Sequence, residues 1–317
     1  MPARGRGPII CSRAGSAWRG THLRRTAAKI KSIRILLICI FSLFYLGCSG
    51  LFFYPSKKEF PNASLRRYDN TQIYFTSTDG VLLNGLLLRP RTVSSAAVLY
   101  LHGNAQNDGA QINNVLWLAD AGFTIFAIDY RGYGRSGGSP DIKGVNEDAE
   151  AALKELGTLC PALKDRIIVF GQSLGGAVAI YAVANYKPKS DIKALVVDSA
   201  FSGYREIARE KIARFWPLSY LLYPLTFTIN DHYSPADWID QIGSVPLLLI
   251  CSTNDPVVPA ENSFRLFKEA KGPKELWVTN IPGHISFLSR EKNRMALIEY
   301  LRQHLAQTSV RRAGAGN

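Results

Sequence analysis

Short apolar runs alternate with helical patterns from residue 72 onward. Two of the runs, Ile73–Phe75 and Leu82–Leu88, flank Asp79-Gly80 and predict an antiparallel hairpin. The later runs predict buried strands at Ala97–Leu101, Thr124–Asp129, Ile167–Gly171, Leu195–Asp198, Leu247–Cys251 and Leu276–Ile281. Helical patterns lie between them, at about 110–121, 141–157, 174–187, 261–270 and 290–305.

This alternation predicts an α/β fold with a mostly parallel sheet and helices on both faces, because parallel strands need crossover connections. In such sheets ligands bind beyond the carboxyl ends of the strands. One segment interrupts the alternation at about residues 201–244 and is rich in aromatic residues. An insertion of this size after a strand predicts a short lid over a site.

The sequence predicts three parts: a basic segment with a signal or anchor region over residues 1–53, the α/β domain over 54–305, and a basic tail over 306–317. The net charge of +13 comes largely from the two ends, because residues 1–34 hold nine Arg and Lys residues and no acidic residue. Without the ends the body is close to neutral. It therefore has no basic face for a phosphate backbone, and we expect no nucleic-acid partner.

The basic segment is followed by the uncharged run ILLICIFSLFYL, residues 35–46, and then by Gly47-Cys48-Ser49. This order is typical of a secretory signal that ends in a lipoprotein cleavage site, with Cys48 as the lipidation candidate, although Tyr45 departs from the aliphatic residue preferred there. The alternative is an uncleaved helix from Ile33 to about Phe53, since a bilayer needs about 20 residues. Both interpretations predict a membrane-anchored protein with its α/β domain outside the cytoplasm, in the periplasm if it is bacterial. Residues 1–30 also fit an organellar transit peptide.

A candidate nucleophile stands where a predicted strand meets a predicted helix. Gly171-Gln172-Ser173-Leu174-Gly175 has the G-x-S-x-G pattern, in which a sharp turn presents the serine hydroxyl. The helix that begins there favours negative charge near its amino end. We therefore expect Ser173 to act as a nucleophile.

A serine nucleophile needs a base that a third group holds in place. His284 follows the last predicted strand and is the candidate base, since the usual chain order is serine, acid, histidine. Asp255 follows the strand before it and is the candidate acid, with Asp198 as the alternative. An oxyanion hole takes one backbone N–H from the residue after the nucleophile and one from the loop after an earlier strand. These donors are expected at Leu174 and at Asn104 in His102-Gly103-Asn104.

With these residues in place, the chain resembles the α/β-hydrolase superfamily over residues 70–305. It is more closely similar to the membrane-anchored branch of α/β-hydrolase domain proteins. The stretches that carry the resemblance are His102–Ala105, Asp129–Ser136 and Gly171–Ala179, completed by Asp255 and His284. Bacterial members often begin with a lipoprotein signal and a following Phe-Tyr-Pro, as Phe53-Tyr54-Pro55 does here.

The resemblance implies a serine hydrolase acting on carboxylic esters or thioesters, including fatty-acyl ones, through an acyl-enzyme. Such chemistry uses no metal or organic cofactor, and none is expected. The alternatives are a peptidase or amidase on the same fold, and a non-catalytic lipid-binding scaffold. The sequence predicts no oligomeric state.

Overall fold

We describe a computed structural model of the chain, which covers residues 52–58, 60–214, 217 and 219–314, with residues 31 and 34 apart from them. The chain divides into Met1–Cys48 and a compact unit, Ser49–Asn317. Phe53 is one of the buried residues of the compact unit.

The compact unit is built on an eight-stranded sheet in the order β1-β2-β4-β3-β5-β6-β7-β8. Strands β1 and β2 form the predicted antiparallel hairpin, β2 pairs antiparallel with β4, and the other neighbours are parallel. This is the α/β fold expected from the sequence. The strands are β1 (Asp69–Thr76), β2 (Leu82–Arg89), β3 (Ala97–Leu101), β4 (Thr124–Asp129), β5 (Ile167–Gln172), β6 (Ile192–Asp198), β7 (Leu247–Ser252) and β8 (Lys274–Thr279).

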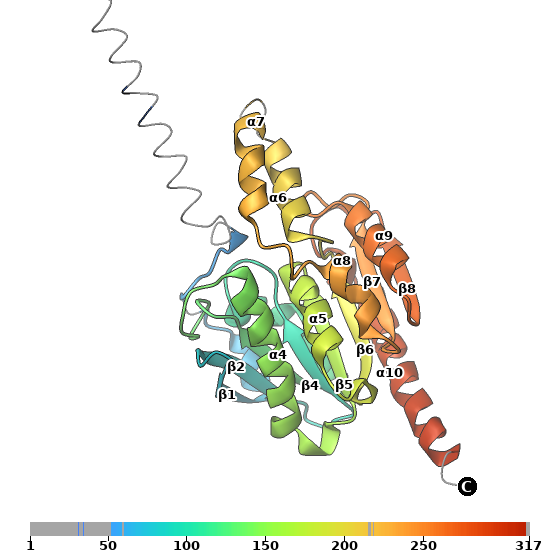
Figure 1. Cartoon of the computed structure of the whole chain (residues 1–317). Coiled ribbons are helices and arrows are strands. Elements are labelled where there is room, and N and C mark those ends of the chain that lie inside the picture. Colours follow the sequence, from blue (N-terminus) through green and yellow to red (C-terminus); the bar gives the residue numbers. More distant parts are fainter. Residues whose placement is uncertain are drawn as a thin grey trace, which may run out of the picture. The chain divides into compact units, whose positions relative to one another are not determined.

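Helices cover both faces of the sheet (Figure 1). Every residue of β3, β4, β5, β6 and β7 is buried, which is why these segments read as apolar runs. On one face α4 (Ile142–Leu159) packs against α5 (Leu174–Asn185), which also contacts α8 (Pro235–Trp238). Side chains of α3 (Leu116–Asp120) and α10 (Glu291–Gly314) share one apolar core on the other face.

Most predicted elements have nearly the observed bounds. Strands β1 and β6 begin earlier than predicted, at Asp69 instead of Ile73 and at Ile192 instead of Leu195. Three other elements also differ. The predicted helix 110–121 is instead α2 (Asp108–Gln111), a 3-10 turn (Ile112–Asn114) and α3, because the chain leaves helical dihedrals at Val115. Strand β8 ends at Thr279, before the predicted end at Ile281. Helix α10 extends beyond residue 305 to Gly314, into the segment predicted as a tail.

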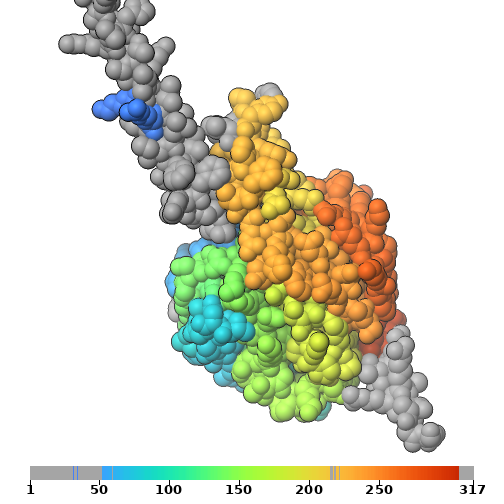
Figure 2. Space-filling model, in the orientation of Figure 1, coloured from blue at the N-terminus to red at the C-terminus, as the bar shows by residue number. Residues whose placement is uncertain are grey.

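The predicted insertion lies between β6 and β7. It contains α6 (Tyr204–Ala213), α7 (Ser219–Leu222), the 3-10 helices Tyr223–Thr228 and Ile239–Ile242, and α8. Figure 1 shows α6 and α7 rising above the carboxyl ends of the strands, and Figure 2 shows the same segment as a yellow and orange projection. Phe215 and Trp216 of the insertion lie outside the described residues.

Candidate active site

Ser173 stands between β5 and α5 in a backbone conformation that L-residues rarely adopt. Its φ is 55° and its ψ is −116°, which costs about 1–3 kcal/mol and persists only where neighbouring structure imposes it. Its N–H donates a 2.8 Å hydrogen bond to the carbonyl oxygen of Asp198, at the end of β6. The turn therefore presents the serine at the carboxyl edge of the sheet, where ligands of α/β folds bind.

Two glycines make this turn possible. A Cβ on Gly171 would lie 2.2 Å from the carbonyl oxygen of Gly175, and a Cβ on Gly175 would lie 1.9 Å from that of Leu101. Both contacts are with backbone, which cannot move aside without displacing β3 or α5. The G-x-S-x-G pattern thus has a steric cause here.

His284 and Asp255 are hydrogen-bonded to each other. His284 Nδ1 lies 2.7 Å from Asp255 Oδ2, and the other carboxylate oxygen accepts the N–H groups of Val257 (2.7 Å) and Val258 (3.0 Å). Burial opposes ionisation of Asp255, but these hydrogen bonds and the charge of His284 outweigh it and hold the pKa of Asp255 below its usual value. Asp255 is therefore an ionised acceptor that fixes the orientation of the imidazole.

The loops that carry these two residues are tied together. Ser252 donates to the carbonyl oxygen of Ile281 (2.6 Å), and Asn254 donates to that of Asn280 (2.8 Å). His284 itself follows Gly283, whose φ is +114°. These bonds hold the loop after β8 against the loop after β7.

Asp198, the alternative acid, has other partners. Its carboxylate accepts hydrogen bonds from Gln172 (3.0 Å) and Ser199 (3.0 Å) and is fully buried. Burial raises the pKa of Asp198 to about 6, against the effect of those two hydrogen bonds. The hydrogen bond of His284 is with Asp255 and not with Asp198.

Among the described residues, no hydrogen bond joins the Ser173 hydroxyl to His284. Catalytic hydrogen bonds of this kind are often long in uncomplexed enzymes and shorten when substrate binds. Asp198 lies behind the nucleophile, because its carbonyl oxygen accepts the Ser173 N–H.

The segment His102–Asn107, called the HGN loop below, lies beside the serine. A Cβ on Gly103 would be 3.5 Å from Ser173 Cβ, so the loop backbone is in contact with the nucleophile. Neither the Asn104 N–H nor the Leu174 N–H has a hydrogen-bond acceptor among the described residues. The two predicted oxyanion donors are thus both without an acceptor among the described residues, one in the residue after Ser173 and one in the loop that contacts it.

One residue of this site had no sequence signal. Gln111 accepts from the Gly103 N–H (3.1 Å) and donates to the carbonyl oxygens of Gly103 (3.2 Å) and Ala105 (2.5 Å). It clamps the HGN loop from the side of α2. Only the fold reveals it, because its neighbours in sequence form no motif.

The remaining sequence predictions fall elsewhere. Cys48 and the apolar run 35–46 lie outside the described residues, and within the described part of the chain no helix is both long and apolar enough to span a bilayer. The described residues also contain no cluster of His, Cys, Asp or Glu side chains able to hold a metal ion.

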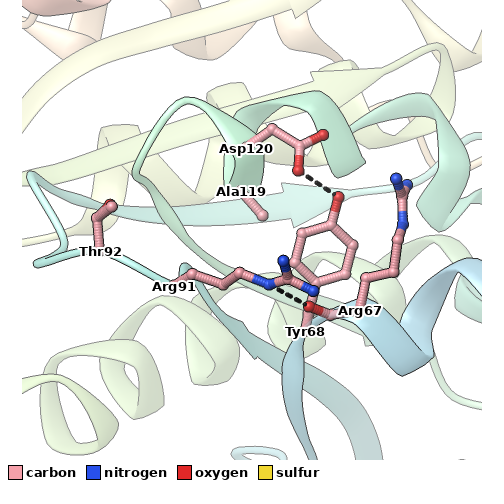
Figure 3. Close-up of a pocket in the computed structure, with 6 residues that line it drawn as sticks. All are labelled: Arg67, Tyr68, Arg91, Thr92, Ala119 and Asp120. Atoms are coloured by element: carbon pink, nitrogen blue, oxygen red, sulfur yellow. Dashed lines mark hydrogen bonds between the residues drawn. The ribbon is translucent and has the colours of Figure 1, made fainter.

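A separate small pocket lies at the opposite edge of the sheet. It is lined by residues at the start of β1, in the loop after β2 and at the end of α3 (Figure 3): Arg67, Tyr68, Arg91, Thr92, Ala119 and Asp120. The Tyr68 hydroxyl donates to Asp120 (2.7 Å), and burial together with this bond raises the pKa of Tyr68 to about 12. Because the parallel strands begin at this edge, the pocket is distant from Ser173.

Comparisons with known proteins identify the family of the chain. The sequence model of the hydrolase family described as serine aminopeptidase, S33, matches residues 92–236. Protein YfhR of Salmonella typhi is 30% identical over 301 residues, covering 90% of this chain and 98% of its own, and bem46 of Schizosaccharomyces pombe is 32% identical over 217 residues, covering 67% and 68%. An esterase of Pyrococcus furiosus has a similar structure, with a TM-score of 0.66 and 25% identity over 80% of this chain and 99% of that one. The chain belongs to the α/β-hydrolase family that includes these relatives.

Proposed function

We propose that this protein is a serine hydrolase that cleaves carboxylic esters or thioesters, with Ser173 as nucleophile, His284 as base and Asp255 as the acid that orients it. The hydrogen bond between His284 and Asp255, at the sheet edge where the strained Ser173 is presented, carries the proposal. The esterase from Pyrococcus furiosus supports the reaction class.

The reaction has two halves. In the first, His284 takes the proton of the Ser173 hydroxyl while the serine oxygen attacks the acyl carbonyl carbon. The resulting oxyanion accepts hydrogen bonds from the N–H groups of Asn104 and Leu174. Its collapse breaks the bond to the leaving alcohol or thiol, which departs with the proton held by His284.

In the second half, water replaces the leaving group. His284 takes a proton from the water, the hydroxide attacks the acyl-enzyme carbonyl, and the same two N–H groups stabilise the second oxyanion. The acid product leaves as Ser173 recovers its proton from His284. Apart from the substrate and this water, the reacting groups are the side chains of Ser173 and His284 and the two backbone N–H groups.

A fatty-acyl substrate at a membrane fits the surface near the site. Four large aromatic side chains are exposed on the first described segment and on the insertion: Tyr54, Tyr220, Tyr223 and Phe227. Arg209 lies over the rings of Tyr223 (4.9 Å) and Phe227 (5.2 Å). Aromatic and basic side chains together suit a membrane interface, where the basic segment and apolar run at the amino end would hold the protein.

The test is turnover across a substrate series. Full-length protein and Ser173→Ala are assayed on esters and thioesters from acetyl to palmitoyl, and on aminoacyl anilides because the matching family is described as serine aminopeptidase. We expect ester or thioester turnover that rises with chain length and falls by at least about 10³-fold in Ser173→Ala. Turnover of anilides alone would make the protein a peptidase instead. Equal turnover in both proteins would remove Ser173 from the mechanism.

A further inference from the structure

The first described residues run along the HGN loop. Residues 52–58, called the strap below and drawn in blue in Figure 1, form a parallel bridge between Pro55 and Gln106 and a 3.1 Å hydrogen bond from the Ser56 N–H to the Gln106 carbonyl oxygen. Asn107 donates to the carbonyl oxygens of Ser56 (3.1 Å) and Lys58 (2.8 Å). The strap is therefore hydrogen-bonded along the loop rather than at a single point.

The side chain of Asn104 makes two further hydrogen bonds between the two segments. Its Oδ1 accepts from the Tyr54 N–H (3.0 Å) and from the Tyr133 hydroxyl (2.8 Å), and its Nδ2 donates to the carbonyl oxygen of Phe52. The backbone N–H of the same residue has no acceptor among the described residues. Asn104 thus binds the strap with its side chain, while its backbone N–H has no acceptor among the described residues.

The HGN loop needs such support because its backbone is strained. Gln106 has a φ of 63°, a conformation that a non-glycine residue holds only when its surroundings impose it. Within the loop the Ala105 N–H bonds the Gly103 carbonyl oxygen (3.0 Å), which makes a tight turn. Gln111 holds this turn from one side, and the strap holds it from the other.

The strap is itself fixed at further points. The Gly134 N–H donates to the Ser56 carbonyl oxygen (2.9 Å), and Lys57 donates to that of Ser136 (3.0 Å). The Phe52 ring packs edge-on against Tyr204, the first residue of α6, with centroids 6.4 Å apart. The strap therefore joins the loop after β4 and the insertion to the HGN loop.

We infer that the strap sets the position of the Asn104 N–H, with the Asn104 side chain as a positioning residue for the oxyanion. This inference rests on the proposed function. An oxyanion donor acts only when it lies about 2.7–3.1 Å from the developing charge, and a displacement near 1 Å costs about a hundredfold in rate. A side chain that fixes its own backbone N–H therefore acts on the transition state without touching substrate.

The test uses full-length protein with two variants and a matched control. Asn104→Ala keeps the backbone donor and deletes the side-chain bonds, whereas Tyr133→Phe removes one bond at nearly constant volume. Asn70→Ala is the control. The Asn70 side chain also donates to two backbone carbonyl oxygens, those of Leu65 and Tyr68, but it lies on an edge strand far from Ser173. The concentration of active sites is measured by titration with a fluorophosphonate. The maximal rate is divided by this concentration, so that misfolded protein does not lower the value of kcat.

We expect Asn104→Ala to lower kcat about 10- to 100-fold with KM changed less than about twofold. Tyr133→Phe should lower it by a smaller factor in the same direction. Affinity for a trifluoromethyl ketone should fall by the same factors. Ser173 adds to the carbonyl carbon of this inhibitor as His284 takes the serine proton, and the ketone oxygen becomes an oxyanion that needs the same N–H donors. Asn70→Ala should keep kcat within about twofold even if it unfolds more easily.

Three results would overturn the inference. One is wild-type kcat per active site in both Asn104→Ala and Tyr133→Phe. The second is a rise in KM with kcat unchanged. The third is a lower kcat with unchanged affinity for the ketone. A wild-type protein with neither ester turnover nor a fluorophosphonate adduct would refute the proposed function first, and the inference with it.

Discussion

His284 Nδ1 lies 2.7 Å from the carboxylate of Asp255, whereas the carboxylate of Asp198, one strand earlier, is occupied by Gln172 and Ser199. The two candidate acids are therefore distinguished by what they bind. Asp255 accepts from the imidazole and from two loop N–H groups, and Asp198 supports the turn behind the nucleophile.

This difference predicts unequal mutational effects. Asp255→Asn should lower kcat about 10³- to 10⁴-fold, because an amide neither holds the required tautomer nor stabilises the imidazolium. Asp198→Asn should lower it less than about tenfold. Steady-state kinetics on one ester, normalised to active sites, compares them, and a reversed order of severity would make Asp198 the acid.

The buried carboxyl of Asp198 predicts a pH-dependent stability. Its pKa is about 6 in the folded protein against 3.8 for the free side chain, so the folded state binds more protons between these values. Ionisation of Asp198 therefore lowers the free energy of unfolding. This destabilisation is absent below about pH 4, grows as pH rises, and is complete above about pH 6. Asp198→Asn should therefore stabilise the protein at pH 7.5 by up to about 3 kcal/mol and change little at pH 4. Urea unfolding at both pH values measures this, and equal shifts at the two would show that ionisation is not the cause.

The glycines of the turn around Ser173 should tolerate an added methyl group far less well than a glycine with open space around it. Gly175→Ala places a Cβ 1.9 Å from the Leu101 carbonyl oxygen, so it should destabilise the protein by about 3 kcal/mol and abolish turnover. Gly157→Ala, in α4 with no atom within 4 Å of the new Cβ, should stabilise it by about 0.5–1 kcal/mol and leave turnover unchanged. Thermal melts and ester assays compare the two. A Gly175→Ala protein as stable and active as wild type would contradict the close backbone contacts of the turn around Ser173.

The amino-terminal segment predicts one of two outcomes for Cys48→Ser. If Cys48 is lipidated, the wild type is shortened and membrane-bound, because its acyl chains contribute about 0.8 kcal/mol per buried CH₂. The variant then remains uncleaved or is mislocalised. If the segment is an uncleaved helix, both proteins are full-length and membrane-bound. Cell fractionation with mass measurement separates these outcomes. Full-length protein in the soluble cytoplasmic fraction for both would contradict membrane anchoring.

The sequence predicted strands β3 to β7 well because every residue in them is buried, so that they read as continuous apolar runs. It also predicted Ser173, Asp255 and His284 as a set, since the fold orders them along the chain. It could not predict that Gln111 and the strap hold the HGN loop, because these contacts join segments with no shared motif. The continuous helix expected at 110–121 is not observed, because the chain leaves helical dihedrals at Val115, a residue fully buried in the core.

Whether Ser173 is an activated nucleophile is measured by treating the full-length protein with a fluorophosphonate and mapping the adduct by peptide mass spectrometry. We expect a single adduct on Ser173 that is absent from Ser173→Ala and formed far more slowly by His284→Ala, because the serine depends on its base. No adduct in a folded wild type, or an adduct on another residue that persists in Ser173→Ala, would contradict this expectation.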